Sequence, residues 1–110
     1  MTDAGELRWR VDFEQRAEVD GDRLGDFVAE FDRRAKFTFL RGSEPVLAQR
    51  LQGVQPVVIR VRAEARTRAV TAEWRIRDRR SGKLYEIKSV TPDESGAWID
   101  FLAEGEGRTS

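Results

Sequence analysis

The sequence predicts a mainly all-β fold, a small antiparallel barrel or sandwich of six to seven strands with an inserted loop that carries a short helix. Two features of the chain predict it. Apolar and polar residues alternate with period two in a series of short segments, which is the pattern of strands with one buried face. Turn-forming Gly, Pro, Asp and Ser residues separate these segments. There is no internal repeat or low-complexity tract, so we expect one domain over residues 1–110.

The N-terminal half is expected to supply the first strands of the sheet. A strand is predicted over 7–14, where apolar residues alternate with charged ones; they are Leu7, Trp9, Val11 and Phe13. Residues 16–26 contain three Asp and two Gly, and are expected to form a turn or a flexible loop. The alternation returns over 27–31, is interrupted at 32–34 and resumes over 35–40, which predicts two further strands.

An inserted loop is expected over about 41–56. Its helix-capable segment, 45–51, follows Ser43, which can serve as an N-cap, and ends at Gly53. A new strand pattern begins near Gln55. An excursion of this kind between two strands usually contacts a partner rather than building a core. We therefore expect the loop to touch a neighbouring protein and to be mobile in the free protein.

The C-terminal half repeats the alternation. Strands are predicted over 57–61, 70–76, 84–90 and 97–102. Turns are predicted between them, at 66–68, 78–83 and 91–96. The tail 103–110 has no apolar pattern and is expected to be frayed, so the core of the domain should cover about 5–102.

The composition restricts the function. The chain has no Cys, so a disulfide, a thiolate metal site and a thiol nucleophile are absent, and it has no His, the commonest general base and transition-metal ligand. Its 20 basic and 20 acidic residues cancel, whereas proteins that bind nucleic acid mainly through phosphates usually carry a basic excess. Seventeen of the 20 basic residues are Arg. Arg favours bidentate carboxylate pairs at protein–protein surfaces, although the codon usage of a GC-rich genome would give the same bias.

The sequence contains no clear signature of a catalytic or metal site. An acidic stretch superficially resembles a calcium loop, namely Asp20, Asp22, Gly25 and Asp26. The positions that should hold an oxygen ligand and a bidentate Glu are Leu24 and Phe31, so we expect no metal and no cofactor. Six glutamates could supply a carboxylate pair, but most lie at outward positions where they are expected to be solvated: Glu14, Glu18, Glu30, Glu44, Glu73 and Glu86. We therefore expect no catalytic residue. No segment is long and apolar enough to span a membrane, and no signal sequence is apparent, which predicts a cytoplasmic protein.

A possible basic stripe leaves a second class of function open. It would run along the outer face of two adjacent strands through Arg60, Arg62, Arg66, Arg68, Arg75 and Arg77. Such a stripe would suit a barrel that binds single-stranded nucleic acid, a DNA channel, or pairing with acidic residues of a neighbouring subunit. An ordinary solvated face is the alternative. Trp74 shares parity with Ile76, which places it in the core rather than on a base-stacking surface.

Read from end to end, the chain resembles the head–tail joining proteins of long-tailed bacteriophages, also called head-closure or stopper proteins, which occur too in gene transfer agents. The resemblance covers about residues 5–102. The matching segments, in chain order, are Gly5-Glu6-Leu7-Arg8-Trp9-Arg10-Val11, the loop from Asp20-Gly21 to Gly25-Asp26 with the strand 27–31, Leu40-Arg41-Gly42-Ser43-Glu44 with Ala48-Gln49-Arg50-Leu51, and Gly82-Lys83-Leu84-Tyr85-Glu86-Ile87 with Ser89-Val90.

This resemblance implies a non-enzymatic virion protein with a β-barrel fold, assembled in the bacterial cytoplasm. Copies would form a homo-oligomeric ring, with the portal or adaptor above it and the tail terminator or tail tube below; the isolated chain could still be monomeric. DNA would meet the ring only by passing through the channel. Another ring component, an adaptor or a tail terminator, is the nearest alternative. The expected contact residues lie in the inserted loop and are Arg41, Glu44, Gln49 and Arg50.

Overall fold

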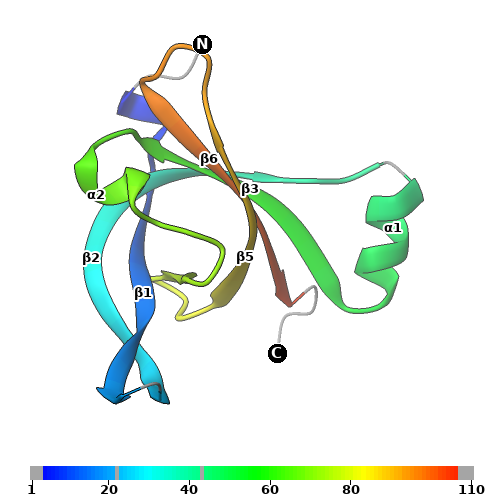
Figure 1. Ribbon diagram of the computed structural model, residues 1–110. Helices are drawn as coiled ribbons and strands as arrows, with labels where there is room; N and C mark the ends of the chain where they lie inside the picture. The colour runs from blue at the N-terminus through cyan, green and yellow to red at the C-terminus, as the bar shows by residue number, and fades with distance from the viewer. Residues whose placement is uncertain (1–3, 22, 43, 107–110) are drawn as a thin grey trace.

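Six antiparallel strands form one closed barrel in the order β1-β2-β3-β6-β5-β4 (Figure 1). The computed structural model describes residues 4–21, 23–42 and 44–106. The strands are β1 (Trp9–Asp20), β2 (Arg23–Phe39), β3 (Val54–Arg62), β4 (Arg75–Asp78), β5 (Leu84–Pro92) and β6 (Trp98–Glu106). The helical segments are η1 (Ala4–Glu6), α1 (Glu44–Leu51) and α2 (Ala65–Arg68). The predicted fold class, a small antiparallel barrel with a helix-bearing insertion, is confirmed.

The core fills the inside of the barrel with the alternating apolar residues of every strand. The ring of Trp9 stacks on Phe37, with their centroids 5.2 Å apart, and the ring of Phe13 lies 5.4 Å from Phe101. The edge of Tyr85 meets Phe37 at 5.4 Å. Because the two rings of each pair lie on different strands, these contacts join β1, β2, β5 and β6 across the barrel.

Strand β2 is one strand of 17 residues, whereas the sequence predicted two strands with an interruption at 32–34. The interruption reflects Arg33, which pairs opposite the buried Val11 and forms an ion pair with Glu64. The strand also contains a register shift. Phe13 of β1 pairs with Phe31, but the next residue, Glu14, pairs with Ala29, so Glu30 is an extra residue on β2. Such a bulge moves the side chains on one side of it to the other face of the sheet. Phe31 therefore packs toward the core, while Ala29 shares the outer face with Glu14.

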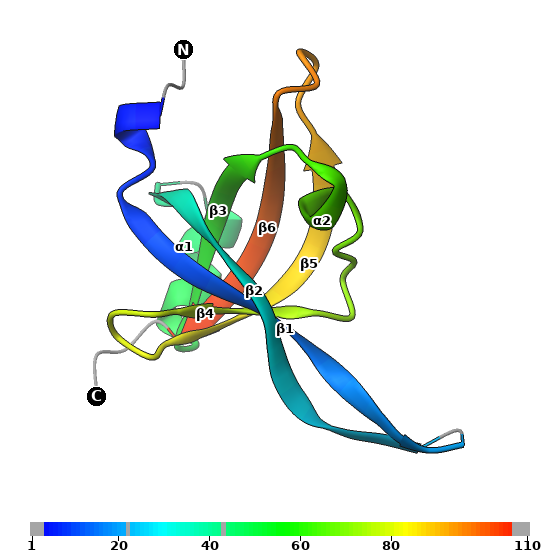
Figure 2. The ribbon, with the colours of Figure 1, turned by 90° about the vertical axis from the view of Figure 1, so that its left-hand side faces the viewer.

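The first hairpin continues well beyond the barrel wall. Of the stretch 16–26, expected to be a turn or flexible loop, residues 16–20 belong instead to β1 and 23–26 to β2; the strand ends Asp20 and Arg23 pair with each other, and Gly21 has a positive φ. Strand β1 pairs with β4 only from Val11 to Glu14. We call the two-stranded extension past this point, residues 15–28, the arm; Figure 2 shows it projecting from one end of the barrel.

Three further predictions in the C-terminal half were wrong. The strand predicted over 70–76 is confined to β4, and the turn at 66–68 belongs to helix α2. Buried Thr67 holds this helix, since its Oγ1 donates to the Arg62 carbonyl at 2.8 Å and accepts from the Glu64 amide at 2.9 Å. Strand β6 continues to Glu106 and buries Ala103 completely, so the tail expected over 103–110 is part of the barrel as far as its strand extends. Residues 107–110 lie outside the described part. None of the described helices is long and apolar enough to cross a membrane.

Candidate functional site

Two segments project from the barrel, and they do so on different sides. One is the arm. The other is the loop of residues 40–53, which carries α1 and which we call the α1 loop. Figure 1 shows α1 to one side of the barrel and the arm extending from the other; in the turned view of Figure 2 the arm projects to the lower right and α1 lies behind the barrel. A barrel whose interior is filled by its own side chains offers its projections as the natural places for contact with other molecules.

The base of the α1 loop is fixed to the barrel by hydrogen bonds. The Gln55 side chain donates from Nε2 to the carbonyl oxygens of Leu40 at 3.2 Å and Pro56 at 2.7 Å, and the Leu40 amide donates to the Pro56 carbonyl at 3.1 Å. Gln49, on the helix, donates to Glu104 of β6 at 2.8 Å. Hydrogen bonds therefore hold the two ends of the loop together at its base, and the Gln49 side chain attaches the helix to β6.

Helix α1 packs little against the barrel. None of the residues of α1 is buried, and Leu51 and Leu47 keep 85% and 44% of their surface exposed. An eight-residue helix is not stable by propensity alone, and this one makes its contacts within the chain mainly with β3. An exposed apolar face on a helix of this kind is typical of a surface that is covered by a partner.

The structure gives different settings to the four predicted contact residues. Arg41, Glu44 and Arg50 are exposed, and within the described ranges none of the three forms an ion pair. Gln49, in contrast, is partly buried and serves to attach the helix to Glu104. Ser43, the expected N-cap, lies outside the described residues. The three charged residues are thus available to a partner, while Gln49 has an internal role.

The arm carries a second group of exposed apolar side chains. Val19 is 64% exposed, Leu24 56% and Val28 45%. Within the arm, the Arg16 side chain crosses to β2 and donates to the carbonyl oxygens of Gly25 at 2.9 Å and Leu24 at 3.2 Å. These hydrogen bonds join the two strands of the arm, and Val19, Leu24 and Val28 remain exposed.

At the root of the arm lies a buried carboxylate that the sequence did not reveal. Glu14 is only 6% exposed, and it accepts hydrogen bonds from Nε of Arg75 at 2.6 Å and Nε of Arg77 at 2.8 Å. Burial by itself would raise the pKa of Glu14, but the hydrogen bonds from Arg77 and Arg75 and their charges outweigh it and hold the pKa below its usual value. The outward position of Glu14 predicted a solvated residue. The two arginines reach it only because β4 pairs with β1.

The predicted basic stripe does not exist as one surface. Its residues lie on β3, α2 and β4, and β3 and β4 are not neighbours in the barrel, so the expectation of two adjacent strands was wrong. Arg60 pairs with Asp100 at 2.7 Å and with Asp93 at 3.1 Å. Arg75 and Arg77 share Glu14, and Arg62 lies over the ring of Trp98, 5.3 Å from its centroid. The strand order and the acidic partners therefore divide these arginines into separate groups.

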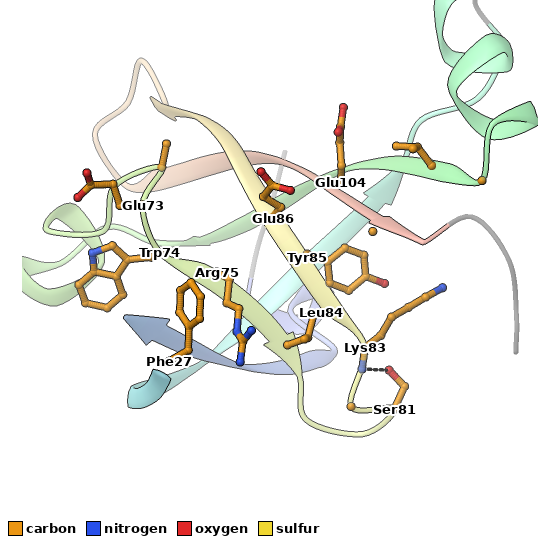
Figure 3. Close-up of a pocket in the computed structure, with 15 residues that line it drawn as sticks. Phe27, Glu73, Trp74, Arg75, Ser81, Lys83, Leu84, Tyr85, Glu86 and Glu104 are labelled. Atoms are coloured by element: carbon orange, nitrogen blue, oxygen red, sulfur yellow. Dashed lines mark hydrogen bonds between the residues drawn. The ribbon is translucent and has the colours of Figure 1, made fainter. Parts of the chain in front are cut away.

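An open groove of about 980 Å³ runs along β4 and β5 (Figure 3). Phe27 and Arg75 lie side by side toward one end of it and Lys83 toward the other. Tyr85 lines its floor, and burial raises the pKa of this phenol, with a smaller contribution from the charge of Asp78. Within the described ranges no cluster of three acidic residues is arranged to hold a metal ion. Part of the acidic stretch considered as a calcium loop, Asp22, is outside those ranges.

Comparison with known proteins adds to this geometry. The model of one protein family, described as phage head completion protein, matches residues 2–106. A chain in the virion of a native gene transfer agent particle is 25% identical and superposes with a TM-score of 0.64, over 88% of this chain and 92% of that one. The solution structure of protein SF1141 from Shigella flexneri 2a has a TM-score of 0.66 at 17% identity, over 99% of this chain and all of that one, which shows a shared fold. No curated protein is a significant match.

The family match covers nearly the whole barrel, including both projections, and it agrees with the resemblance inferred from the sequence. The similar chain in the gene transfer agent virion covers most of the same residues. This chain belongs to the phage head completion protein family.

Proposed function

We propose that this protein is a structural component of the head–tail junction in a tailed phage or a phage-like particle such as a gene transfer agent. Copies of it form a ring below the portal or adaptor, close the DNA-filled head and supply the surface on which the tail docks. Membership of the head completion family and the likeness to a chain of a gene transfer agent virion support this role. Assembly would take place in the host cytoplasm.

The observation that carries the proposal is the exposure of the α1 loop and of its charged side chains. It stands away from the barrel, buries none of its helical residues and presents Arg41, Glu44 and Arg50 without ion-pair partners among the described residues. Elsewhere the barrel wall pairs many of its charges internally, as Arg60 does with Asp100. Unpaired charges beside exposed apolar side chains are typical of a surface that is completed by another protein. We assign these three residues to contacts with a neighbouring subunit or with the portal side.

An adaptor or tail-terminator position in the same junction would use the same projections. A nucleic-acid-binding barrel is less well supported, because the arginines that would form its binding face are separated by the strand order and paired with acidic residues. The domain also carries no net charge to drive phosphate binding.

The decisive test is particle assembly in a strain that lacks this gene, viewed by electron microscopy. We expect separate tails beside unjoined, leaking or empty heads, and recovery of joined particles when the gene is supplied on a plasmid. Intact particles in the deletion strain, or the absence of any heads, would contradict a role at the junction.

A further inference from the structure

We propose that, in the assembled ring, the arm of each copy docks on the α1 loop of the next copy. The inference rests on the proposed function, because it requires several copies of the chain to meet side by side. It assigns a partner to two surfaces that the isolated chain leaves uncovered.

The arm has the properties of a segment that needs a partner. It is a two-stranded ribbon, and such a ribbon is only marginally stable in water without a third strand or a packed face. In the described part of the chain, β2 pairs with no strand other than β1 until Lys36, so its outer edge is open along the whole arm. Val19 and Leu24 expose most of their surface near the tip. Open edges and exposed apolar side chains together favour docking against another surface.

The α1 loop also has exposed apolar side chains that no other part of the described chain covers. Its helix presents Leu47 and Leu51 to solvent and is attached to the barrel mainly through β3 and the Gln49–Glu104 hydrogen bond. A docked ribbon would cover these two leucines with apolar side chains of its own. Burial of apolar surface contributes about 25 cal/mol for each Å² removed from water, so both sides of such a contact would gain.

The placement of the two surfaces fits a ring. The arm and the α1 loop project from different sides of the barrel (Figures 1 and 2). A contact between two different surfaces of the same molecule is heterologous, and it generates a ring when the rotation between successive copies closes. A contact between two arms would be isologous and would end at a dimer. Helix α2, by contrast with α1, lies on the same side of the barrel as the arm (Figure 1), which makes it a poor recipient in such a ring.

Charge also favours a second copy of this chain as the partner. Residues 15–28 contain four acidic residues and two arginines, a net charge of −2, whereas the residues of the α1 loop carry +1. Glu18, Asp20 and Asp26 form no ion pair within the described ranges, and the same holds for Arg41 and Arg50 in the loop. Opposite charges steer the two surfaces together, and two acidic arms would repel each other.

Cross-linking through engineered cysteines tests the contact directly, and the chain has no Cys of its own to interfere. Leu24→Cys and Leu51→Cys would be combined in one chain, and particles assembled with it would be oxidised and run on a denaturing gel without reductant. Both replaced side chains are exposed, so the barrel should fold as before. We expect a ladder of linked copies that collapses on reduction. The two single variants serve as controls and should remain unlinked.

Three results would overturn the docking proposal and leave the head–tail role intact. The first is joined particles whose double-cysteine chains stay unlinked. The second is a dimer from Leu24→Cys alone, which would indicate an arm-to-arm contact. The third is a ladder from a chain that combines Leu24→Cys with Arg68→Cys on α2, without one from the α1 pair. Particles that join without this protein would instead contradict the proposed function itself.

A charge exchange provides an independent measurement if the cysteine chain is not incorporated. Arg50→Glu places like charges at the contact and should lower the yield of joined particles by about tenfold, since juxtaposed like charges repel. Glu18→Arg should do the same from the other side. The two changes together should restore most of the yield. A double variant that joins no better than the worse single variant would contradict the contact.

Discussion

The guanidinium of Arg75 on β4 lies over the ring of Phe27 at the root of the arm, with its Cζ 4.1 Å from the ring centroid. The same side chain donates from Nε to the buried carboxylate of Glu14 on β1. One arginine therefore joins the barrel wall to both strands of the hairpin. These contacts hold the root of the arm to the barrel wall, and the ribbon past this point has no other strand beside it in the described part of the chain.

Removal of the Phe27 ring should loosen the arm without unfolding the barrel. A cation–π contact near the surface contributes about 0.5–1 kcal/mol, so Phe27→Ala should raise amide hydrogen exchange in the arm by roughly two- to fivefold. Exchange in β3 and β6 should stay as in the natural chain. Val28→Ala, an exposed change on the same strand, is the control and should leave exchange in the arm nearly unchanged. Equal effects of the two variants would argue against a role for the Arg75–Phe27 contact.

Replacement of Glu14 should destabilise the protein in a pH-dependent manner. Glu14→Gln leaves Arg75 and Arg77 beside a neutral amide, and we expect a loss of about 1–3 kcal/mol in the free energy of unfolding at pH 7. The pKa of Glu14 is lowered by folding, so its ion pairs stabilise the native state above the ordinary glutamate value of 4.5 and stop doing so as pH falls through the lower, folded value.

Urea unfolding of both proteins at several pH values measures this difference. It should be full near neutral pH and shrink progressively in acid, below the ordinary glutamate value. Glu18→Gln, on the exposed arm, is the matched control and should change stability little at any pH. A difference between Glu14→Gln and the natural chain that persists undiminished at low pH would show that packing, rather than charge, is responsible.

The close approach of Gly105 to Tyr85 should make this glycine difficult to replace. A Cβ added at Gly105 would lie 2.7 Å from Cε1 and 2.8 Å from Cδ1 of the buried tyrosine ring. Gly105→Ala therefore requires the ring to move and should cost about 1–3 kcal/mol of stability. The same change in a Tyr85→Leu background should cost less, since the ring is gone, and a double-mutant cycle measures the coupling. Equal costs in the two backgrounds would contradict the steric explanation.

Reversal of charge at Arg41 should separate folding from assembly. Arg41 is exposed, so Arg41→Glu should change the free energy of unfolding by no more than about 0.5 kcal/mol. It should nevertheless block head–tail joining, because it reverses a charge on the surface assigned to a neighbour. Arg34→Glu, an exposed arginine on the barrel wall, is the control and should join normally. A normal yield of joined particles from Arg41→Glu, counted by electron microscopy, would remove this residue from the contact.

Much of the fold could be read from local patterns. Alternation predicted the barrel, the strand at Val57–Val61 and the inward positions of residues such as Phe13 and Ile76, which are completely buried. The turn chemistry around Ser43 and Gly53 predicted the position of α1, which spans Glu44–Leu51. Alternation and turn chemistry both depend only on residues close together along the chain, and for that reason they predicted these parts of the fold correctly.

Of the two projections that make up the candidate site, the sequence predicted one and not the other. The α1 loop, with Arg41, Glu44 and Arg50, was predicted because a helix inserted between two strands is visible in the sequence. The arm was not predicted, because its Asp and Gly residues indicate a loop and nothing in the sequence states how far two strands remain paired beyond a barrel.

The all-β class, the inserted helix and the family of the chain follow from its amino-acid sequence. The bulge at Glu30, the burial of Glu14 between Arg75 and Arg77, and the separation of the arginines of the predicted stripe follow from the folded arrangement of the strands. The physical reason is the range of the interactions. Alternating burial repeats every two residues along a strand, whereas strand order and register are set by contacts between residues far apart in the chain.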